Sequence, residues 1–310
     1  MLKKPATTFT VLPYIVLLGG VLIAATSSIL IRGAQAAGMP SLHIAAGRLG
    51  LAALILLPIG FGRVRHEVAK ISGRNLLLAA VSGLFLGAHF AAWITSLQYT
   101  SVASSVALVT TNPIWVGLAS LFILRERLPG LLLVGMALTV LGSILIGVSD
   151  SQGAAANNAM LGNGLALLGA IAGSVYFLIG RVLRSHMSIL AYIWLVYSMA
   201  AIVLLLVVGS MWLASGATAP VPFSGYQAST YVFVLLLAIG PQLLGHTSFN
   251  WALRYLSATF VAVSILGEPI GSALLALWLF NERFASLQLL GFALLLTGIV
   301  LAARAERVGE

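Results

Sequence analysis

The chain of 310 residues is 60% hydrophobic and only 7% charged, with a mean hydropathy of +1.08. An average soluble domain carries roughly 25% charged residues, so the composition excludes an ordinary water-soluble fold. The net charge of +9 does not indicate a nucleic-acid partner, because the basic residues stand singly or in pairs between apolar runs rather than on one face.

Ten apolar runs follow one another along the chain, and each is near the roughly 20 residues that one transmembrane helix needs. They cover residues 11–32, 42–60, 75–97, 101–123, 129–148, 160–180, 188–213, 229–250, 257–280 and 285–303. The sequence therefore predicts an all-α integral membrane protein with ten transmembrane helices. A cleaved signal peptide is the alternative for the first run, but the run is longer than the usual apolar region of roughly 7 to 15 residues.

The basic residues are distributed unevenly between the two ends of these runs. With the N-terminus inside, only Arg32, Arg48 and Arg283 fall on or toward the far side. The cytoplasmic side then holds Lys3, Lys4, Arg63, Arg65, Lys70, Arg74, Arg125, Arg127, Arg181, Arg184, Arg254, Arg304 and Arg307. This positive-inside bias predicts a multi-pass protein of the bacterial inner membrane with both termini in the cytoplasm.

The two halves of the chain repeat one another. A shift of 156 residues lays Tyr99, Ser101, Pro113, Glu126, Arg127, Gly135 and Gly142 on Tyr255, Ser257, Pro269, Glu282, Arg283, Gly291 and Gly298. Five helices per half is an odd number, so the halves must cross the membrane in opposite directions. We expect residues 1–150 and 151–310 to form two inverted repeats, with a substrate site near the midplane between them.

Three segments carry a resemblance to a known family. The first is the helix that contains Asn112-Pro113 and ends in residues 124–128, and the second is the helix that contains Gly267-Glu268-Pro269 and ends in residues 281–284. The third is the helix that contains residues 287–291. With them, essentially the whole chain resembles the ten-helix EamA-domain transporters of the drug/metabolite transporter superfamily. Arg48 matches an arginine usually found in the second helix. The resemblance implies helices around a central cavity, alternating access, and export of amino acids, with aromatic amino acids suggested by the aromatic-rich interior, or of other metabolites.

Two helices present polar stripes within the hydrocarbon region, where polar side chains usually face a cavity or a partner. Run 75–97 carries His89, Trp93 and Ser96 on one face, and run 229–250 carries Gln242, His246 and Asn250 on one face. The two histidines lie at mirror depths about the midplane. We expect them to line the substrate cavity; a hydrogen bond between helices with no ligand is the alternative.

A third stripe, in run 257–280, contains Ser264 and Glu268, the one acidic residue that we place at the midplane. Glu268 can bind a substrate ammonium group, carry a coupling proton, or neutralise Arg48. Its equivalent in the first half is the uncharged Asn112.

Two prolines and two aromatic residues complete the predicted site. Pro113 and Pro269 cannot donate a backbone hydrogen bond, which predicts kinks or hinges at equivalent places in the two halves. Trp115 and Tyr176 can present an aromatic face and a polar tip to a substrate, although packing is the commoner role of membrane aromatics. Runs 129–148 and 285–303, with glycines seven residues apart, are predicted to be packing scaffold.

The sequence gives no support for an enzyme, a metal site or a cofactor. It has no cysteine, no G-x-S-x-G, no H-E-x-x-H and no Walker motif. The predicted partners are a small-molecule substrate and the lipid bilayer. A passive channel or facilitator and a membrane scaffold stay open as other classes, and drugs, purines or other metabolites as other substrates. Proton coupling and the choice between monomer and homodimer are also open.

Overall fold

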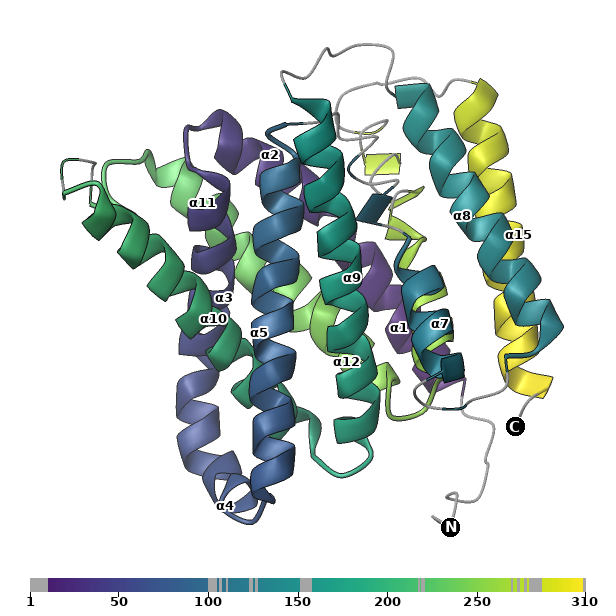
Figure 1. The fold of residues 1–310 in the computed structure, drawn as a ribbon, viewed down its shortest axis with the longest axis horizontal. Helices are drawn as coiled ribbons and strands as arrows, with labels where there is room; N and C mark the ends of the chain where they lie inside the picture. Colours follow the sequence, from purple (N-terminus) through teal and green to yellow (C-terminus); the bar gives the residue numbers. More distant parts are fainter. Residues whose placement is uncertain are drawn as a thin grey trace.

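The computed structural model describes residues 11–99, 105, 108–109, 111–122, 125, 128–150, 158–216, 218, 221–268, 270–271, 274–275, 278 and 286–308. Within this part of the chain every regular element is a helix (Figure 1). Six segments are long and apolar enough to cross a membrane, and they are Leu12–Ala36, Ser41–Val68, Gly73–Ser96, Met160–Arg184, Ile189–Ala214 and Ala228–Ala252. The structure is therefore that of a multi-pass membrane protein.

The helices follow the apolar runs closely. The first half contains α1 (Leu12–Ala24), α2 (Ser27–Ala36), α3 (Ser41–Ile59), the π-helix η1 (Gly60–Val64), α4 (Arg65–Val68), α5 (Gly73–Ser96), α7 (Asn112–Phe122) and α8 (Gly130–Asp150). The second half contains α9 (Ala159–Arg184), α10 (Ile189–Ala214), α11 (Ala228–Leu237), the π-helix η3 (Ala238–His246), α12 (Thr247–Ala252), α13 (Ala258–Ile265) and α15 (Ser286–Val308). Predicted runs 101–123 and 257–280 lie only partly within the described residues.

Local sequence fixes where several helices begin. Ser72, Ser188 and Ser257 each precede a helix, and each hydroxyl accepts a hydrogen bond from the backbone N–H three residues later. Asn158 does the same at the start of α9 with its side-chain oxygen. A side-chain acceptor at this position satisfies one of the backbone donors that a helix leaves free at its N-terminus.

Two of the long apolar segments change their helical geometry along their length. The first divides into α1 and α2 at Thr26, whose hydroxyl donates to the carbonyl of Ile23 at 2.7 Å. The helix of run 229–250 changes into the π-helix η3, which contains Pro241. Because proline has no backbone N–H to give to the preceding turn, the wider π register accommodates it.

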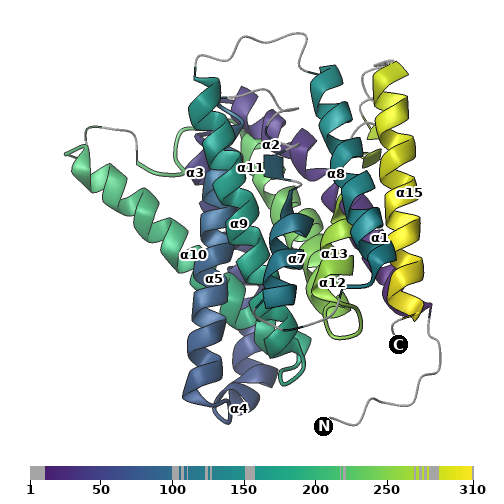
Figure 2. The ribbon, with the colours of Figure 1, turned by 45° about the vertical axis from the view of Figure 1, so that its right-hand side comes forward.

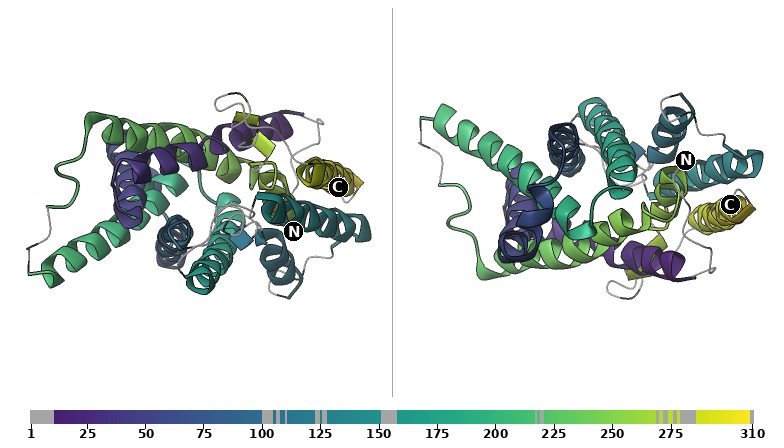
Figure 3. Two further views of the ribbon diagram at one scale, coloured as in Figure 1. Left: turned by 90° about the horizontal axis from the view of Figure 1, so that it is seen from above. Right: turned by 90° about the horizontal axis from the view of Figure 1, so that it is seen from below.

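Helices of one half pack mainly on helices of the other. α5 packs along α9 and α10, while α1 packs against η3 and α12, and α7 and α13 are in contact. The α8 and α15 helices lie side by side at one edge of the molecule, and α10 leans outward at the opposite edge (Figures 2 and 3). The core lies between, where α3, α5, α9, α10 and η3 meet.

The contact between α8 and α15 depends on glycine. A Cβ atom added at Gly135 would lie 2.7 Å from the carbonyl oxygen of Gly298, and one added at Gly142 would lie 2.6 Å from that of Gly291. The two backbones therefore approach more closely than any larger residue allows, as small residues permit in membranes. This agrees with the scaffold role predicted for these helices.

One end of the molecule gathers α4, the turn between α9 and α10, and the end of α15 (Figure 1). These segments carry Arg65, Lys70, Arg184 and Arg304, all from the side predicted to be cytoplasmic. Glu67 fixes α4 to the start of α10, because its carboxylate accepts a hydrogen bond from the backbone N–H of Ser188 at 2.8 Å.

Candidate functional site

A buried arginine stands at the centre of the core. Arg48 on α3 is only 1% exposed. Its Nε donates to the side-chain oxygen of Gln242 on η3 at 2.9 Å, and one terminal nitrogen donates to the hydroxyl of Ser27 on α2 at 3.0 Å. Its guanidinium carbon lies 4.1 Å from the centroid of the Phe90 ring on α5. Polar and aromatic contacts of this kind are what make a buried cation tolerable.

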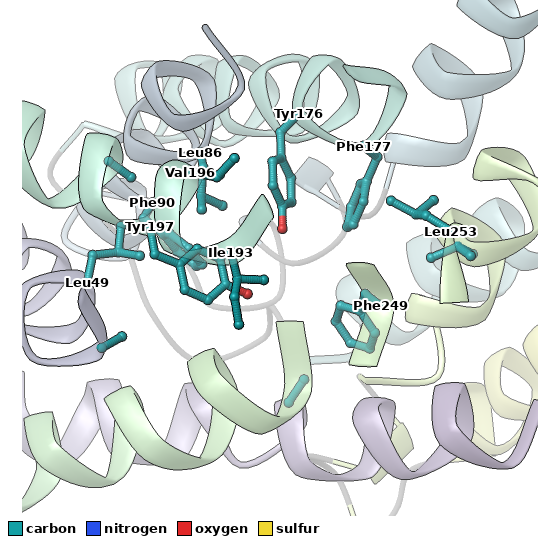
Figure 4. Packing of buried hydrophobic residues seen from close by; sticks show 14 of the residues in the cluster. Leu49, Leu86, Phe90, Tyr176, Phe177, Ile193, Val196, Tyr197, Phe249 and Leu253 are labelled. Atoms are coloured by element: carbon teal, nitrogen blue, oxygen red, sulfur yellow. The ribbon is translucent and has the colours of Figure 1, made fainter. Parts of the chain in front are cut away.

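A second polar cluster joins α9, α10 and α12 beside this arginine. The side-chain amide of Asn250 donates to the hydroxyl of Tyr176, and to that of Tyr197 at 3.2 Å. The Tyr197 hydroxyl also lies 3.3 Å from that of Thr247. Figure 4 shows Tyr176 extending from α9 toward the region between Tyr197 and Phe249. The predicted site residues Asn250 and Tyr176 are thus in direct contact.

Aromatic rings connect the two predicted histidine stripes. The ring centroid of Phe90 lies 4.9 Å from that of His89 and 5.2 Å from that of His246. His89 also stacks on Trp93 at 6.0 Å, and His246 contacts Phe249 at 5.3 Å. Residues from α5 and η3, far apart in the sequence, are therefore brought to one place.

Four buried polar atoms in this region have no hydrogen-bond partner among the described residues. They are the indole nitrogen of Trp93, Nε2 of Gln242, Nδ1 of His246 and Oδ1 of Asn250. Gln242 and Asn250 are fully buried, and Trp93 and His246 are 9% exposed. Buried polar groups are nearly always hydrogen-bonded, so these four atoms make this region a candidate binding site for a polar ligand.

His89, in contrast, is hydrogen-bonded to a neighbouring helix. Its Nδ1 lies 2.8 Å from the carbonyl oxygen of Gly169 on α9, which can only accept, so Nδ1 carries the proton and donates. A Cβ atom at the neighbouring Gly173 would lie 2.8 Å from this nitrogen. This is the hydrogen bond between helices that the sequence left open as the alternative for a histidine.

Three other predicted site residues have local partners. The Ser96 hydroxyl donates to the carbonyl of Trp93 at 2.7 Å and lies 2.6 Å from the hydroxyl of Ser105. Ser264 donates to the carbonyl of Phe260 in its own helix, and the indole of Trp115 donates to Thr111 at 3.1 Å. The polar groups of Ser96, Ser264 and Trp115 therefore already form hydrogen bonds within the protein.

The equivalent residues Asn112 and Glu268 each follow a break in their helix. The α7 helix begins at Asn112, one residue before Pro113, and the α13 helix ends at Ile265, followed by a turn before Glu268. Asn112 is 9% exposed and Glu268 is half-buried. Pro269, the second predicted hinge, lies outside the described residues.

Two central residues were absent from the predicted site. Arg48 carries a detectable signal, because an ionisable residue inside a membrane run is a functional candidate by default. Tyr197 carries none, since it sits in the apolar run 188–213 and only its contacts in space reveal its role.

A multi-pass helical protein whose two halves enclose a buried cation and unsatisfied polar groups has the features of a membrane transporter. Within the described residues, no cluster of His, Cys, Asp or Glu that could hold a metal ion is present. The profile of the EamA-like transporter family matches residues 11–148 and 160–304. The chain belongs to this family.

Relatives of known sequence agree with this assignment. The chain is 29% identical over 265 residues to a probable amino-acid metabolite efflux pump of Escherichia coli strain K12, covering 84% of this chain and 85% of that protein. It is 22% identical over 256 residues to an uncharacterized transporter of Clostridium kluyveri, covering 81% and 79%. These names are those of transporters, not enzymes.

A solved crystal structure has the same fold. It superposes with a TM-score of 0.76 at 17% sequence identity and covers 96% of this chain and 98% of its own. The similarity extends over nearly the whole length of both proteins.

Proposed function

We propose that this protein exports small metabolites, foremost α-amino acids, across the inner membrane by alternating access. The observation that carries the proposal is the set of four unpartnered polar atoms beside the fixed cation Arg48. The name of the Escherichia coli relative, a probable amino-acid metabolite efflux pump, supports the substrate class.

The chemistry of these atoms suits an amino acid. The N–H groups of Trp93 and Gln242 can donate to a carboxylate, which the charge of Arg48 would also attract. The free oxygen of Asn250 and the carboxylate of Glu268 can accept from an ammonium group. The rings of Phe90, His246 and Phe249 offer an apolar and aromatic surface for the side chain of the substrate.

We further infer that ten helices form two inverted repeats around this site. The family profile matches once in each half, at residues 11–148 and 160–304. The packing of α5 on α9 has its counterpart in the packing of α1 on η3 and α12. Basic residues at the end of the molecule that holds α4 favour cytoplasmic termini by the positive-inside rule.

Alternating access would rock the two halves about the centre. The breaks before Asn112 and before Glu268 stand at equivalent positions of the two halves and supply hinges. Because both halves of one chain contribute to the site, a monomer suffices. The central side chains Arg48, Gln242 and Asn250 are 1% exposed or less, so this conformation is closed at the site.

The test is binding and flux with labelled amino acids, nucleosides and cationic drugs in proteoliposomes, with and without a pH gradient. Trp93→Phe removes an indole N–H that bonds to no group among the described residues, so the fold of this variant should be unaffected. A hydrogen bond to a charged group contributes about 1.5–3 kcal/mol, which predicts a loss of amino-acid affinity of about 10- to 100-fold. The matched control is Trp194→Phe, whose buried indole N–H is also unpartnered but lies away from the site.

Unchanged affinity in Trp93→Phe would remove the site from this centre, and flux of no solute at all would favour a membrane scaffold. Alternating access is tested separately. The chain has no cysteine, so single cysteines at His89 and His246 can be labelled without interference. Accessibility that does not change with substrate or pH gradient would exclude the rocking motion.

A further inference from the structure

We propose that a groove between α5 and α10 binds one acidic phospholipid from the cytoplasmic leaflet, with an acyl chain in the groove and the phosphate on basic residues at its mouth. This site lies on the outer surface of the helix bundle. It shares no residue with the central site, and only its assignment to the cytoplasmic leaflet rests on the orientation inferred with the proposed function.

The groove has a volume of about 220 Å³ and a mostly apolar lining. It is formed by Leu76 and Ala80 of α5 and by Trp194, Leu195, Ser198, Met199 and Ile202 of α10. Ile202 is 53% exposed, so the groove opens to the surroundings of the helices. For a membrane-spanning protein those surroundings are lipid chains, and an apolar hollow on this surface fits a hydrocarbon.

The two helices cross beside Met199, one of the residues that line the groove. A Cβ atom at Gly83 would lie 2.6 Å from Cβ of Met199, so the helices touch there. From Leu76 to Gly83 the rise is about 10 Å, which is within the roughly 15 Å of one leaflet of the hydrocarbon core. The residues of α5 that line the groove, Leu76 and Ala80, therefore lie within the leaflet at the α4 end, at the depth of an acyl chain.

The mouth of the groove is positively charged. Arg63, Arg65, Lys70 and Arg74 are exposed and lie on α4, its flanks and the first turn of α5. Figure 1 shows α4 beside the start of α5. The acidic residue among them, Glu67, is half-buried and accepts a hydrogen bond from the backbone of Ser188. Basic clusters at the cytoplasmic surface attract anionic lipid headgroups, and this charge favours an acidic lipid over a zwitterionic one.

The geometry also favours a lipid over the other occupants of such a groove. A substrate with several charged groups would find only the indole N–H of Trp194 and the hydroxyl of Ser198 in a lining that is otherwise apolar. A second copy of the chain would bring its own α4 region, and four exposed cations would then face the same cations of the partner. A negatively charged phosphate on an apolar tail matches both parts of the site.

The experiment uses the full-length protein in nanodiscs that contain brominated lipids, which quench tryptophan fluorescence at contact. The signal of Trp194 is the difference between the wild-type protein and Trp194→Phe. We expect dibrominated phosphatidylglycerol to quench this signal at several-fold lower mole fraction than dibrominated phosphatidylcholine. High salt should reduce the difference, because the headgroup contact is electrostatic.

Two pairs of variants separate headgroup from chain. Lys70→Gln with Arg74→Gln should abolish the preference for phosphatidylglycerol, whereas the control Arg254→Gln with Arg304→Gln should retain it. Ala80→Phe should fill the groove and reduce quenching by both lipids, whereas Leu84→Phe, on the exposed face of α5, should not.

Three results would overturn the proposal. Equal quenching by the two lipids in the wild-type protein would mean ordinary annular contact. A preference that survives Lys70→Gln with Arg74→Gln would place the headgroup elsewhere. Protection of Trp194 from both lipids, with chemical cross-linking between copies, would mean that a second chain covers the groove.

Discussion

The hydrogen bond between Arg48 and Gln242 allows a prediction about the free energy of unfolding. Arg48→Met should lower it in the wild-type protein but raise it in the Gln242→Leu background. Gln242→Leu removes the oxygen that accepts from Nε of Arg48 at 2.9 Å and leaves that donor buried without a partner. Arg48→Met removes the donor and leaves two acceptors, in Gln242 and Ser27, without it. The double variant removes both ends of the bond.

The magnitudes follow from these contacts. A hydrogen bond to a charged group is worth about 1.5–3 kcal/mol, and leaving a buried partner unsatisfied costs about 1–3 kcal/mol or more. Arg48→Met also loses the contact of the guanidinium with Phe90, but it removes a charge from the membrane interior, which offsets part of the loss. We expect Gln242→Leu to destabilise the fold by about 2 kcal/mol, and Arg48→Met to restore most of that in the Gln242→Leu background.

The assay is reversible unfolding by SDS in mixed micelles, for the wild-type protein and the three variants. The free energy of unfolding of the double variant should exceed the additive value by about 1.5–3 kcal/mol. The control is the cycle of Arg48→Met with Ser210→Ala, which share no partner and should add within about 0.5 kcal/mol. Additivity within that same limit for Arg48 and Gln242 would refute the reasoning.

Three further predictions concern packing, the polar cluster and a helix cap. Gly135→Leu should lower the free energy of unfolding by at least about 2 kcal/mol, because the new side chain would meet the backbone of α15. The control Gly164→Leu should not, because no atom lies within 4 Å of a Cβ atom at that position. Equal effects of the two substitutions would contradict a close α8–α15 contact. Asn250→Leu leaves two tyrosine hydroxyls without their donor and should cost about 1–3 kcal/mol in the same assay, and no loss would mean that water replaces the amide. Ser72→Ala should lower the free energy of unfolding by about 1 kcal/mol and speed amide hydrogen exchange in the first turn of α5. Ser72→Gly should lower the free energy of unfolding by only a few tenths of a kcal/mol. Unchanged exchange in Ser72→Ala would argue against the helix cap.

Much of the site could be anticipated from helical spacing. His246 and Asn250, predicted to share a face of one helix, both border the central region, and Tyr176 joins them from α9. The spacing of Gly135 and Gly142 similarly anticipated the close contact of α8 with α15. Helical periodicity allows such groupings to be predicted, because it places these residues on one face before any tertiary contact forms.

The same reasoning did not distinguish residues that look alike in sequence. His89 and His246 are both predicted to lie in a polar stripe at mirror depth. Nδ1 of His89 is hydrogen-bonded to the carbonyl of Gly169, whereas Nδ1 of His246 has no partner among the described residues. The reason is that α9 presents a carbonyl beside His89, which no local pattern encodes. The π register of η3 is likewise invisible in the apolar periodicity of its run.

By itself, the sequence determined that this chain spans a membrane through helices that follow its apolar runs, because the transfer of side chains into hydrocarbon depends on local composition alone. Only the tertiary structure decided which polar groups are satisfied. Arg48 meets Gln242 across 194 positions of the chain, and the unpartnered atoms of Trp93, Gln242, His246 and Asn250 come from two helical segments far apart in sequence. A hydrogen bond requires two atoms at a fixed distance and direction, and for residues so far apart that geometry exists only after the helices have packed.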